Sequence, residues 1–337
     1  MLYSKEKLEK LQNRWLTTKG KKLIKVIKSS RCYLSPVLFR QKVQNFPGIN
    51  DEEVRNGIDL RGATLMGFDF RIPVKEDDNG YIEDLAILSE IHFEGANLKH
   101  CNFQEGKIHD CYFEDADLTH ADFKGATISN CYFQESDCSG LNINNAKIID
   151  CNFTDATIKD MSASTAFIDQ KSTFGSELKS EKEKNYHFAA IEYKQIKEMF
   201  RNSSLHTLGD YYHYKEMVAK RKDIEWYKPT RWLNYIFGDL LCKYGTSFIN
   251  VLLASSITVF VCALLFTHHN SLVYQSQVIT PSLSTSIYFS IVTFTTLGYG
   301  DYHAIGAMRY IAATEALIGA ILMSLLTVIV ARKLIRD

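Results

Sequence analysis

An apolar or small residue recurs at every fifth position over residues 88–168 of this 337-residue chain. The series is Leu88, Phe93, Leu98, Phe103, Ile108, Phe113, Leu118, Phe123, Ile128, Phe133, Cys138, Ile143, Ile148, Phe153, Ile158, Ala163 and Ile168. A second, mostly small residue stands two positions before most of them, as Ala96, Cys101 and Gly106 do. A period of five fits neither a helix nor a flat strand. The segment therefore forms a structure whose repeating unit is five residues long.

This pattern resembles the pentapeptide-repeat family, as Ala96-Asn-Leu-Lys-His and Ala116-Asp-Leu-Thr-His illustrate. The resemblance implies a right-handed quadrilateral β-helix, with four repeats in each coil. It places a solenoid at residues 58–178, and residues four repeats apart should stack on one another. Two such columns are expected, Phe93, Phe113, Phe133 and Phe153 in one, and Ile108, Ile128, Ile148 and Ile168 in the other.

Residues 71–86 interrupt the repeat. Asn79-Gly80 lies there between short β-prone segments, which predicts a hairpin insertion that protects the edge of the coil. A calcium loop is excluded, because Lys75 and Ala86 would occupy its first and last ligand positions.

Cys111, Cys131 and Cys151 should fall in one further column of the solenoid. We interpret them as small, mildly apolar residues that fill the interior. Metal binding or redox chemistry is the alternative. The chain contains no C-x-x-C pair, which favours the interior role.

A second motif, Thr296-Leu297-Gly298-Tyr299-Gly300, constrains the C-terminal part of the chain. A dehydrated K⁺ needs oxygens in place of its water shell, and T-x-G-Y-G loops supply them from backbone carbonyls. Apolar segments on both sides predict membrane spans at residues 246–267 and 304–331, since about 20 apolar residues cross a bilayer. Residues 281–294 are too short to cross, and the preceding Thr280-Pro281-Ser282 favours a helix start. We expect a re-entrant pore helix there.

Residues 286–301 match the pore helix and filter of two-transmembrane tetrameric potassium channels, and residues 245–337 are similar to their pore domain. The resemblance implies a homotetramer in which carbonyls of Thr296, Leu297, Gly298 and Tyr299 bind K⁺, while Gly300 completes the filter. Many members carry two tryptophans where this chain has Tyr288 and Phe289. The Tyr288 hydroxyl is expected to bond Asp301 and brace the filter.

The second predicted span contains four further candidates. Glu315 is an ionisable residue within a span, so we expect it to support the filter from behind; the alternative is a place near the outer interface, paired with Arg309. Gly319 is a candidate gating hinge, as in the resembled family, or a small residue that permits close packing. Met323 and Thr327 follow on the same helical face and are candidates for the inner pore lining.

Orientation follows from the basic residues. Arg231, Lys243, Arg332, Lys333 and Arg336 lie on one side of the pair of spans, whereas residues 268–281 contain no lysine or arginine. The distribution predicts a multi-pass protein of the cell (inner) membrane with both termini cytoplasmic. The first residues are too charged for a signal peptide.

Charge is uneven along a chain whose formal net charge is zero. Residues 1–57 hold 5 acidic and 13 basic residues, whereas residues 88–170 hold 14 acidic and 5 basic ones. We expect residues 1–57 to form a basic helical cap on the solenoid. Contact with the acidic solenoid, contact with the anionic inner leaflet, and simple solvation of both surfaces are the alternatives.

Two segments connect the predicted domains. Residues 179–228 are helix-prone and predict a helical hairpin connector, and residues 229–244 predict an amphipathic helix at the membrane surface. No span has the regular arginines of a voltage sensor, so control of opening is expected from the N-terminal domain.

We therefore expect a multidomain membrane protein: a β-helix, a helical connector and a two-span pore that conducts K⁺ passively. It should be a homotetramer in contact with membrane lipid and with an unknown cytoplasmic ligand or protein regulator, without nucleic acid. No enzymatic activity is expected, and no cofactor besides permeant K⁺. A weakly selective cation channel and a membrane-anchored pentapeptide-repeat interaction protein are the alternatives.

Overall fold

The computed structural model describes residues 4–29, 57–71, 87–267 and 271–336. The chain divides into two compact units, Met1–Asp223 and Ile224–Asp337. The hairpin insertion predicted at residues 71–86 lies outside the described residues except for Arg71, and so do residues 30–56 of the predicted cap.

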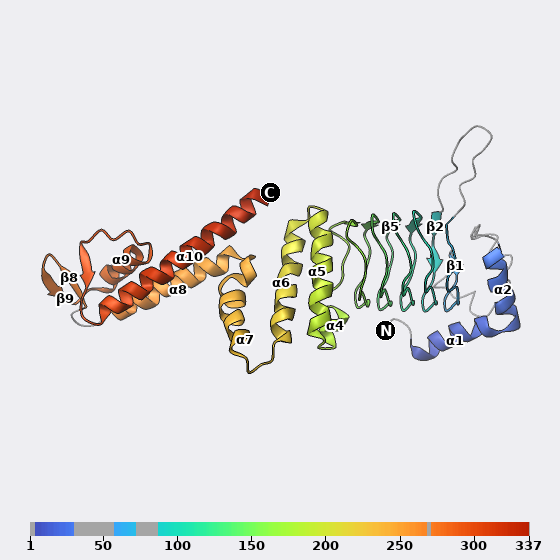
Figure 1. Cartoon of the computed structure of the whole chain (residues 1–337), viewed down its shortest axis with the longest axis horizontal. Helices are drawn as coiled ribbons and strands as arrows, with labels where there is room; N and C mark the ends of the chain where they lie inside the picture. The colour runs from blue at the N-terminus through green and yellow to red at the C-terminus, as the bar shows by residue number, and fades with distance from the viewer. Residues whose placement is uncertain (1–3, 30–56, 72–86, 268–270, 337) are drawn as a thin grey trace, which may run out of the picture. The chain divides into compact units, whose positions relative to one another are not determined.

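The first unit is a β-solenoid with helices packed on both of its ends (Figure 1). Its elements in chain order are α1 (Lys5–Leu16), α2 (Thr18–Ser29), β1 (Ile58–Asp59), β2 (Ile87–Ser89), β3 (Ile91–His92), β4 (Lys107–His109), β5 (Thr127–Ser129), β6 (Lys147–Ile149), β7 (Phe167–Ile168), α4 (Lys179–Lys182), α5 (Tyr186–Asn202) and α6 (His206–Asp223). The strands β2, β4, β5, β6 and β7 form one parallel sheet in that order. Its register joins Ile108, Ile128, Ile148 and Ile168, which confirms the predicted isoleucine column.

Each five-residue repeat ends in a residue with a left-handed backbone. Positive φ values recur at every fifth position over residues 90–160, for example 54° at Asp110, 50° at Asn130 and 53° at Asp150. Glycine, asparagine and aspartate adopt this conformation at lower cost than other residues, which accounts for their frequency at this position. The left-handed residue turns the chain through a corner, so the strands stay short and the coil closes.

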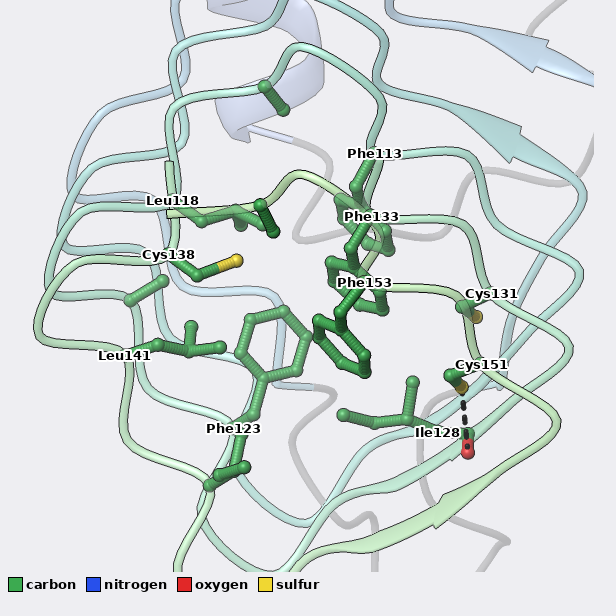
Figure 2. Close-up of a cluster of buried hydrophobic side chains, with 14 of the residues drawn as sticks. Phe113, Leu118, Phe123, Ile128, Cys131, Phe133, Cys138, Leu141, Cys151 and Phe153 are labelled. Carbon is green, nitrogen blue, oxygen red and sulfur yellow. Dashed lines mark hydrogen bonds between the residues drawn. The ribbon is translucent and has the colours of Figure 1, made fainter. Parts of the chain in front are cut away.

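The interior of the solenoid is a set of stacked rings and small side chains (Figure 2). Phe113 stacks on Phe133 with ring centroids 4.8 Å apart, and Phe133 stacks on Phe153 at 4.5 Å. These contacts confirm the predicted phenylalanine column. The column continues to Phe174, whose ring lies 5.1 Å from that of Phe153, although one extra residue has entered the repeat.

The cysteines of the solenoid occupy the interior. Cys131 and Cys151 are buried and direct their thiols toward the backbone carbonyls of Ile108 and Ile128 in the preceding coil (Figure 2). Burial raises the pKa of the Cys131 thiol well above its usual value. A thiol with so high a pKa is unreactive, which fits the interior role expected from the sequence.

Helix α1 closes the first coil of the solenoid. Arg14 donates two hydrogen bonds to the Asp59 carboxylate, at 2.9 and 2.6 Å, and Trp15 Nε1 donates to the Arg61 carbonyl at 2.6 Å. Gly62 has φ +69°, and a Cβ there would lie 2.6 Å from the backbone of Leu11. The described part of the basic segment thus packs on the solenoid end, as a cap does.

Helices α4, α5 and α6 close the other end, so the boundary between the units follows Asp223 instead of residue 178. The Phe174 ring meets Phe200 edge to face, and Phe200 stacks on Tyr212 at 5.3 Å. Between the helices, Lys197 and Glu216 form a buried ion pair with a 2.8 Å separation. The predicted helical hairpin exists, but it is a cap on the solenoid.

The second unit contains two long apolar helices. Its elements in chain order are α7 (Pro229–Leu233), η2 (Asn234–Leu240), η3 (Lys243–Gly245), α8 (Phe248–Phe266), β8 (Leu272–Tyr274), β9 (Gln277–Ile279), α9 (Leu283–Phe294), β10 (Tyr302–Ala304) and α10 (Met308–Arg336). Both α8 and α10 are long and apolar enough to cross a membrane, with mean hydropathies of 2.4 and 2.1 in their most apolar windows. The strands form an antiparallel sheet in the order β10, β8, β9, which the sequence reasoning missed.

The segment predicted as one amphipathic helix at residues 229–244 has three parts. An α-helical turn, α7, leads into the π-helix η2, and the short 3-10 helix η3 follows, with non-helical backbone angles at Tyr244. Trp232, Phe237 and Leu240 are exposed, each by more than half of its surface. The membrane-surface role of this segment stays a prediction.

Phe133→Ala should destabilise the first unit by about 3–5 kcal/mol, because the ring is held between two others and its loss leaves a cavity. Urea unfolding of the full chain in detergent measures the change. Phe167→Ala is the matched control, since Phe167 is on the same solenoid but is 45% exposed, and it should cost less than about 1 kcal/mol. Equal losses in both variants would contradict the interior column.

Glu114 should make the solenoid less stable as the pH rises. Burial, and then the nearby Glu94, raises the pKa of the Glu114 carboxyl from 4.5 to about 8. The folded state therefore keeps a proton that the unfolded state releases, and stability falls from about pH 4.5 until about pH 8, where it levels off. Melting temperatures of the full chain across this range measure the effect. Glu114→Gln should remove this part of the slope, and an unchanged slope would contradict the assignment.

Candidate ion-conducting site

Helix α9 lies between the two apolar helices, where the pore helix was predicted. Ser282 is its N-cap, and the Ser282 hydroxyl accepts a hydrogen bond from the Thr285 amide. The helix begins at Leu283, so Pro281 precedes it and does not occupy its first turn. At 12 residues α9 is too short to cross a membrane, and its C-terminal end delivers the chain to residues 296–300.

The backbone of residues 296–300 alternates between left-handed and other conformations. Thr296, Gly298 and Gly300 have φ values of 57°, 56° and 77°, and Leu297 and Tyr299 between them are outside the left-handed region. Such alternation turns successive carbonyls toward the same side, whereas an extended strand points them to opposite sides. Glycine adopts positive φ without the cost that a Cβ imposes. The five predicted filter residues thus have a backbone suited to lining an axis with oxygens.

The filter loop is tied to the pore helix but otherwise exposed. The Thr296 amide donates to the Thr293 carbonyl at 3.0 Å, and the Leu297 amide donates to the Val292 carbonyl at 3.1 Å. The side chains of Leu297 and Tyr299 are 60% and 68% exposed on the single chain. One chain therefore leaves this loop open to neighbours.

Tyr288 and Asp301 are brought together as expected. The Tyr288 hydroxyl donates to Asp301 Oδ2 at 2.9 Å, across the filter from pore helix to filter exit. The Tyr302 ring meets Tyr288 edge to face and stacks on Tyr274 of β8 at 4.8 Å. A row of three tyrosines thus connects the pore helix to the antiparallel sheet. The short β-prone segments around Gln275 and Ser276 were the signal for that sheet.

Glu315 lies behind the pore helix and is almost completely buried, with 1% exposure. Its carboxyl is hydrogen-bonded to the Ser290 hydroxyl of α9, and Ser290 Oγ is also 2.8 Å from the Val259 carbonyl of α8. The alternative partner, Arg309, donates instead to the Ala304 carbonyl. The structure therefore places Glu315 against the pore helix, and sequence reasoning missed Ser290.

Gly319 lies on α10 one turn after Glu315, and it faces Phe294 at the end of the pore helix. A Cβ at this position would lie 2.0 Å from the Phe294 carbonyl oxygen, which no side chain can do without displacing backbone. The pairs Ser290–Glu315 and Phe294–Gly319 both advance by four residues, so α9 and α10 run in the same direction in contact. Close packing thus requires the glycine, and α10 is one helix through this point.

Met323 and Thr327 lie on the exposed face of α10. Leu322 and Ile329 point the other way, into an apolar cluster with Phe294. Met323 is 43% exposed, and the Thr327 hydroxyl donates to the Met323 carbonyl of its own helix, at 2.9 Å. Side chains that line a shared pore are exposed in this way on one chain.

An elbow, Lys243–Gly245, precedes the first apolar helix, and the sequence reasoning did not find it. Its three residues have φ values of 45°, 54° and 79°. A Cβ on Gly238 would lie 2.3 Å from the Tyr244 ring, so the absence of a side chain at Gly238 leaves room for that ring. A Cβ on Gly245 would lie 3.8 Å from an Arg332 nitrogen, which brings the elbow next to the end of α10.

Comparisons with known proteins agree with both halves of this architecture. The family described as "Ion channel" matches residues 247–336, and the pentapeptide-repeat family matches in eight copies over residues 86–115, 96–134, 111–148 and 121–160. No curated protein matches the chain.

Similar solved structures include three pentapeptide-repeat proteins. HetL, involved in heterocyst differentiation regulation in the cyanobacterium Nostoc sp. strain PCC 7120, is 22% identical over 35% of this chain and 52% of its own, with a TM-score of 0.25. A protein of the Arabidopsis thaliana thylakoid lumen is 24% identical over 30% of this chain and 66% of its own, with a TM-score of 0.22. A pentapeptide-repeat protein (Rfr23) from the cyanobacterium Cyanothece 51142 is 13% identical over 42% of this chain and 100% of its own, with a TM-score of 0.22.

The chain thus spans about half the length of HetL and about two thirds of the Arabidopsis protein. The family match over residues 247–336 covers both apolar helices, the pore helix and the filter loop. The chain therefore carries a domain of the two-transmembrane ion-channel family, preceded by a pentapeptide-repeat solenoid.

Proposed function

We propose that the protein is a potassium-selective channel through which K⁺ passes passively. The observation that carries the proposal is the alternating backbone of Thr296, Gly298 and Gly300, which suits a row of inward carbonyls. Carbonyls of Thr296, Leu297, Gly298 and Tyr299 replace the water shell of the ion. No covalent chemistry is involved, and the permeant ion takes the place of any cofactor.

The proposed assembly is a homotetramer in the cell membrane, with both termini in the cytoplasm. A single filter loop offers oxygens from one side only, so several chains must surround the ion. The exposure of Leu297 and Tyr299 on one chain supports this arrangement, because neighbouring subunits would cover the loop. The exposed apolar surfaces of α8 and α10 are available to lipid and to the other subunits.

Opening is proposed to depend on the cytoplasmic solenoid, through a ligand or protein that the solenoid binds. The solenoid is capped at both ends, so it is a rigid body suited to transmitting movement. The elbow at Tyr244 is the joint nearest to the membrane span, and its neighbour Arg332 lies at the end of the inner helix α10. These contacts support a mechanical route from the connecting segment to the inner gate.

Gly298→Ala should abolish K⁺ flux or strongly reduce its selectivity over Na⁺, because the added Cβ disfavours the left-handed backbone at φ +56°. Flux into liposomes and reversal potentials in mixed K⁺ and Na⁺ measure this. Gly306→Ala is the matched control, since Gly306 has the same φ and equally open surroundings but lies outside the filter. Selectivity unaffected by Gly298→Ala, or equal K⁺ and Na⁺ permeability in the wild type, would sink the proposal.

Release of the solenoid from an assembled channel should change its open probability and leave its selectivity unchanged. A protease site inserted between Asp223 and Ile224, at the boundary of the two units, allows the cut to be made after reconstitution. Single-channel recordings before and after cleavage report the effect, with an uncut channel treated with the same protease as control. If cleavage left opening unchanged, the solenoid would have no part in gating.

A further inference from the structure

A line of polar groups joins the three helices around the filter. The Glu315 carboxyl on α10 is hydrogen-bonded to the Ser290 hydroxyl on α9. Ser290 Oγ is in turn 2.8 Å from the Val259 carbonyl oxygen on α8. Ser290 and Glu315 are both buried, with 0% and 1% exposure. The pore helix is thus held to each span through the one serine oxygen.

The number of hydrogens in this line fixes the protonation of Glu315. A serine hydroxyl has one hydrogen to donate, and a backbone carbonyl has none. The contact with Val259 therefore uses the hydrogen of Ser290. The contact with Glu315 then needs a second hydrogen, which an ionised carboxylate lacks and a neutral carboxylic acid supplies.

The surroundings of Glu315 are uncharged. Among the residues that the structure describes, its carboxyl interacts with Ser290 and with the Cys262 thiol of α8. Helix α9 meets it with the hydroxyl of Ser290, and Arg309 of its own helix donates to the Ala304 carbonyl. A buried carboxylate without a cationic partner is costly, whereas a hydrogen-bonded neutral acid is tolerated.

We propose that Glu315 is a positioning residue that is held neutral and donates its proton to Ser290, so that Ser290 can hold α8 and lock the pore helix between both spans. The lock acts on the filter because the Leu297 amide is bonded to Val292 of the same pore helix. Loss of the proton turns Glu315 into an acceptor, which takes the Ser290 hydrogen away from Val259 and releases α8. The effect on conduction rests on the proposed channel function; the protonation state does not.

Infrared difference spectroscopy tests the proton directly. Full-length protein in lipid at neutral pH should show the carbonyl stretch of a protonated carboxyl that is absent from Glu315→Gln. The comparison is made in a Glu114→Gln background, because burial raises the pKa of the Glu114 carboxyl to about 8. At alkaline pH the band should give way to carboxylate bands. A carboxylate signal from Glu315 at neutral pH would overturn the proposal, whether or not the protein conducts.

Liposome flux as a function of pH tests the role of the lock. Wild-type K⁺ flux should fall at alkaline pH, while Glu315→Gln, which keeps a neutral donor, should conduct normally and lose that fall. Glu315→Ala and Ser290→Ala should each lower flux roughly fivefold at neutral pH, the equivalent of about one hydrogen bond. Their double variant should be no worse than either alone.

Ser324→Ala is the matched control for these variants, since within the described parts of the chain the Ser324 hydroxyl bonds only to the Ala320 carbonyl of its own helix, at 2.7 Å. It should leave both flux and pH profile unchanged. Damage from Glu315→Gln equal to that from Glu315→Ala, or the same alkaline fall in both wild type and Glu315→Gln, would refute the lock. A wild type that conducts no ion would refute the channel and leave the infrared result standing.

Discussion

The left-handed backbone residue is the constraint on which both halves of the protein depend. In the solenoid it recurs at every fifth residue and turns the chain through each corner, so that apolar side chains meet inside. In the filter loop it recurs at every second residue and brings the carbonyls to one side. In both places a local backbone conformation, often adopted by glycine, asparagine or aspartate, determines which atoms face inward.

Both units are also built to leave few polar groups unpaired where water is excluded. Arg14 brings its charge to Asp59 at one end of the solenoid, and Lys197 does the same for Glu216 at the other. Behind the pore helix no ion pair to Glu315 occurs among the described residues; its carboxyl is hydrogen-bonded to the Ser290 hydroxyl, which also contacts the Val259 carbonyl. In the caps and in the pore domain alike, a buried polar side chain is thus paired with a partner from a distant part of the chain.

The sequence predicted the features that repeat or that follow from a local motif. The isoleucine and phenylalanine columns came from the five-residue period, and the bond between Tyr288 and Asp301 came from the filter motif. The features it did not reveal depend on contacts between distant segments. Ser290 is one of several serines in α9, and only the approach of Val259 and Glu315 gives it a role. Likewise Tyr244 of the elbow lies against Gly238 of the π-helix, a contact that no periodicity in the sequence indicates.

The solenoid's register has a geometric consequence for evolution of the chain. Because residues four repeats apart are paired, as Ile128 and Ile148 are, gain or loss of one full coil preserves every stacking contact and translates the α4–α6 cap along the axis by about one strand spacing, roughly 4.8 Å. Gain or loss of a single repeat instead rotates that cap by about a quarter turn relative to the first coil. The distance between the two caps and the rotation of one cap relative to the other can therefore change separately. Whole coils change mainly the distance, and single repeats change mainly the rotation.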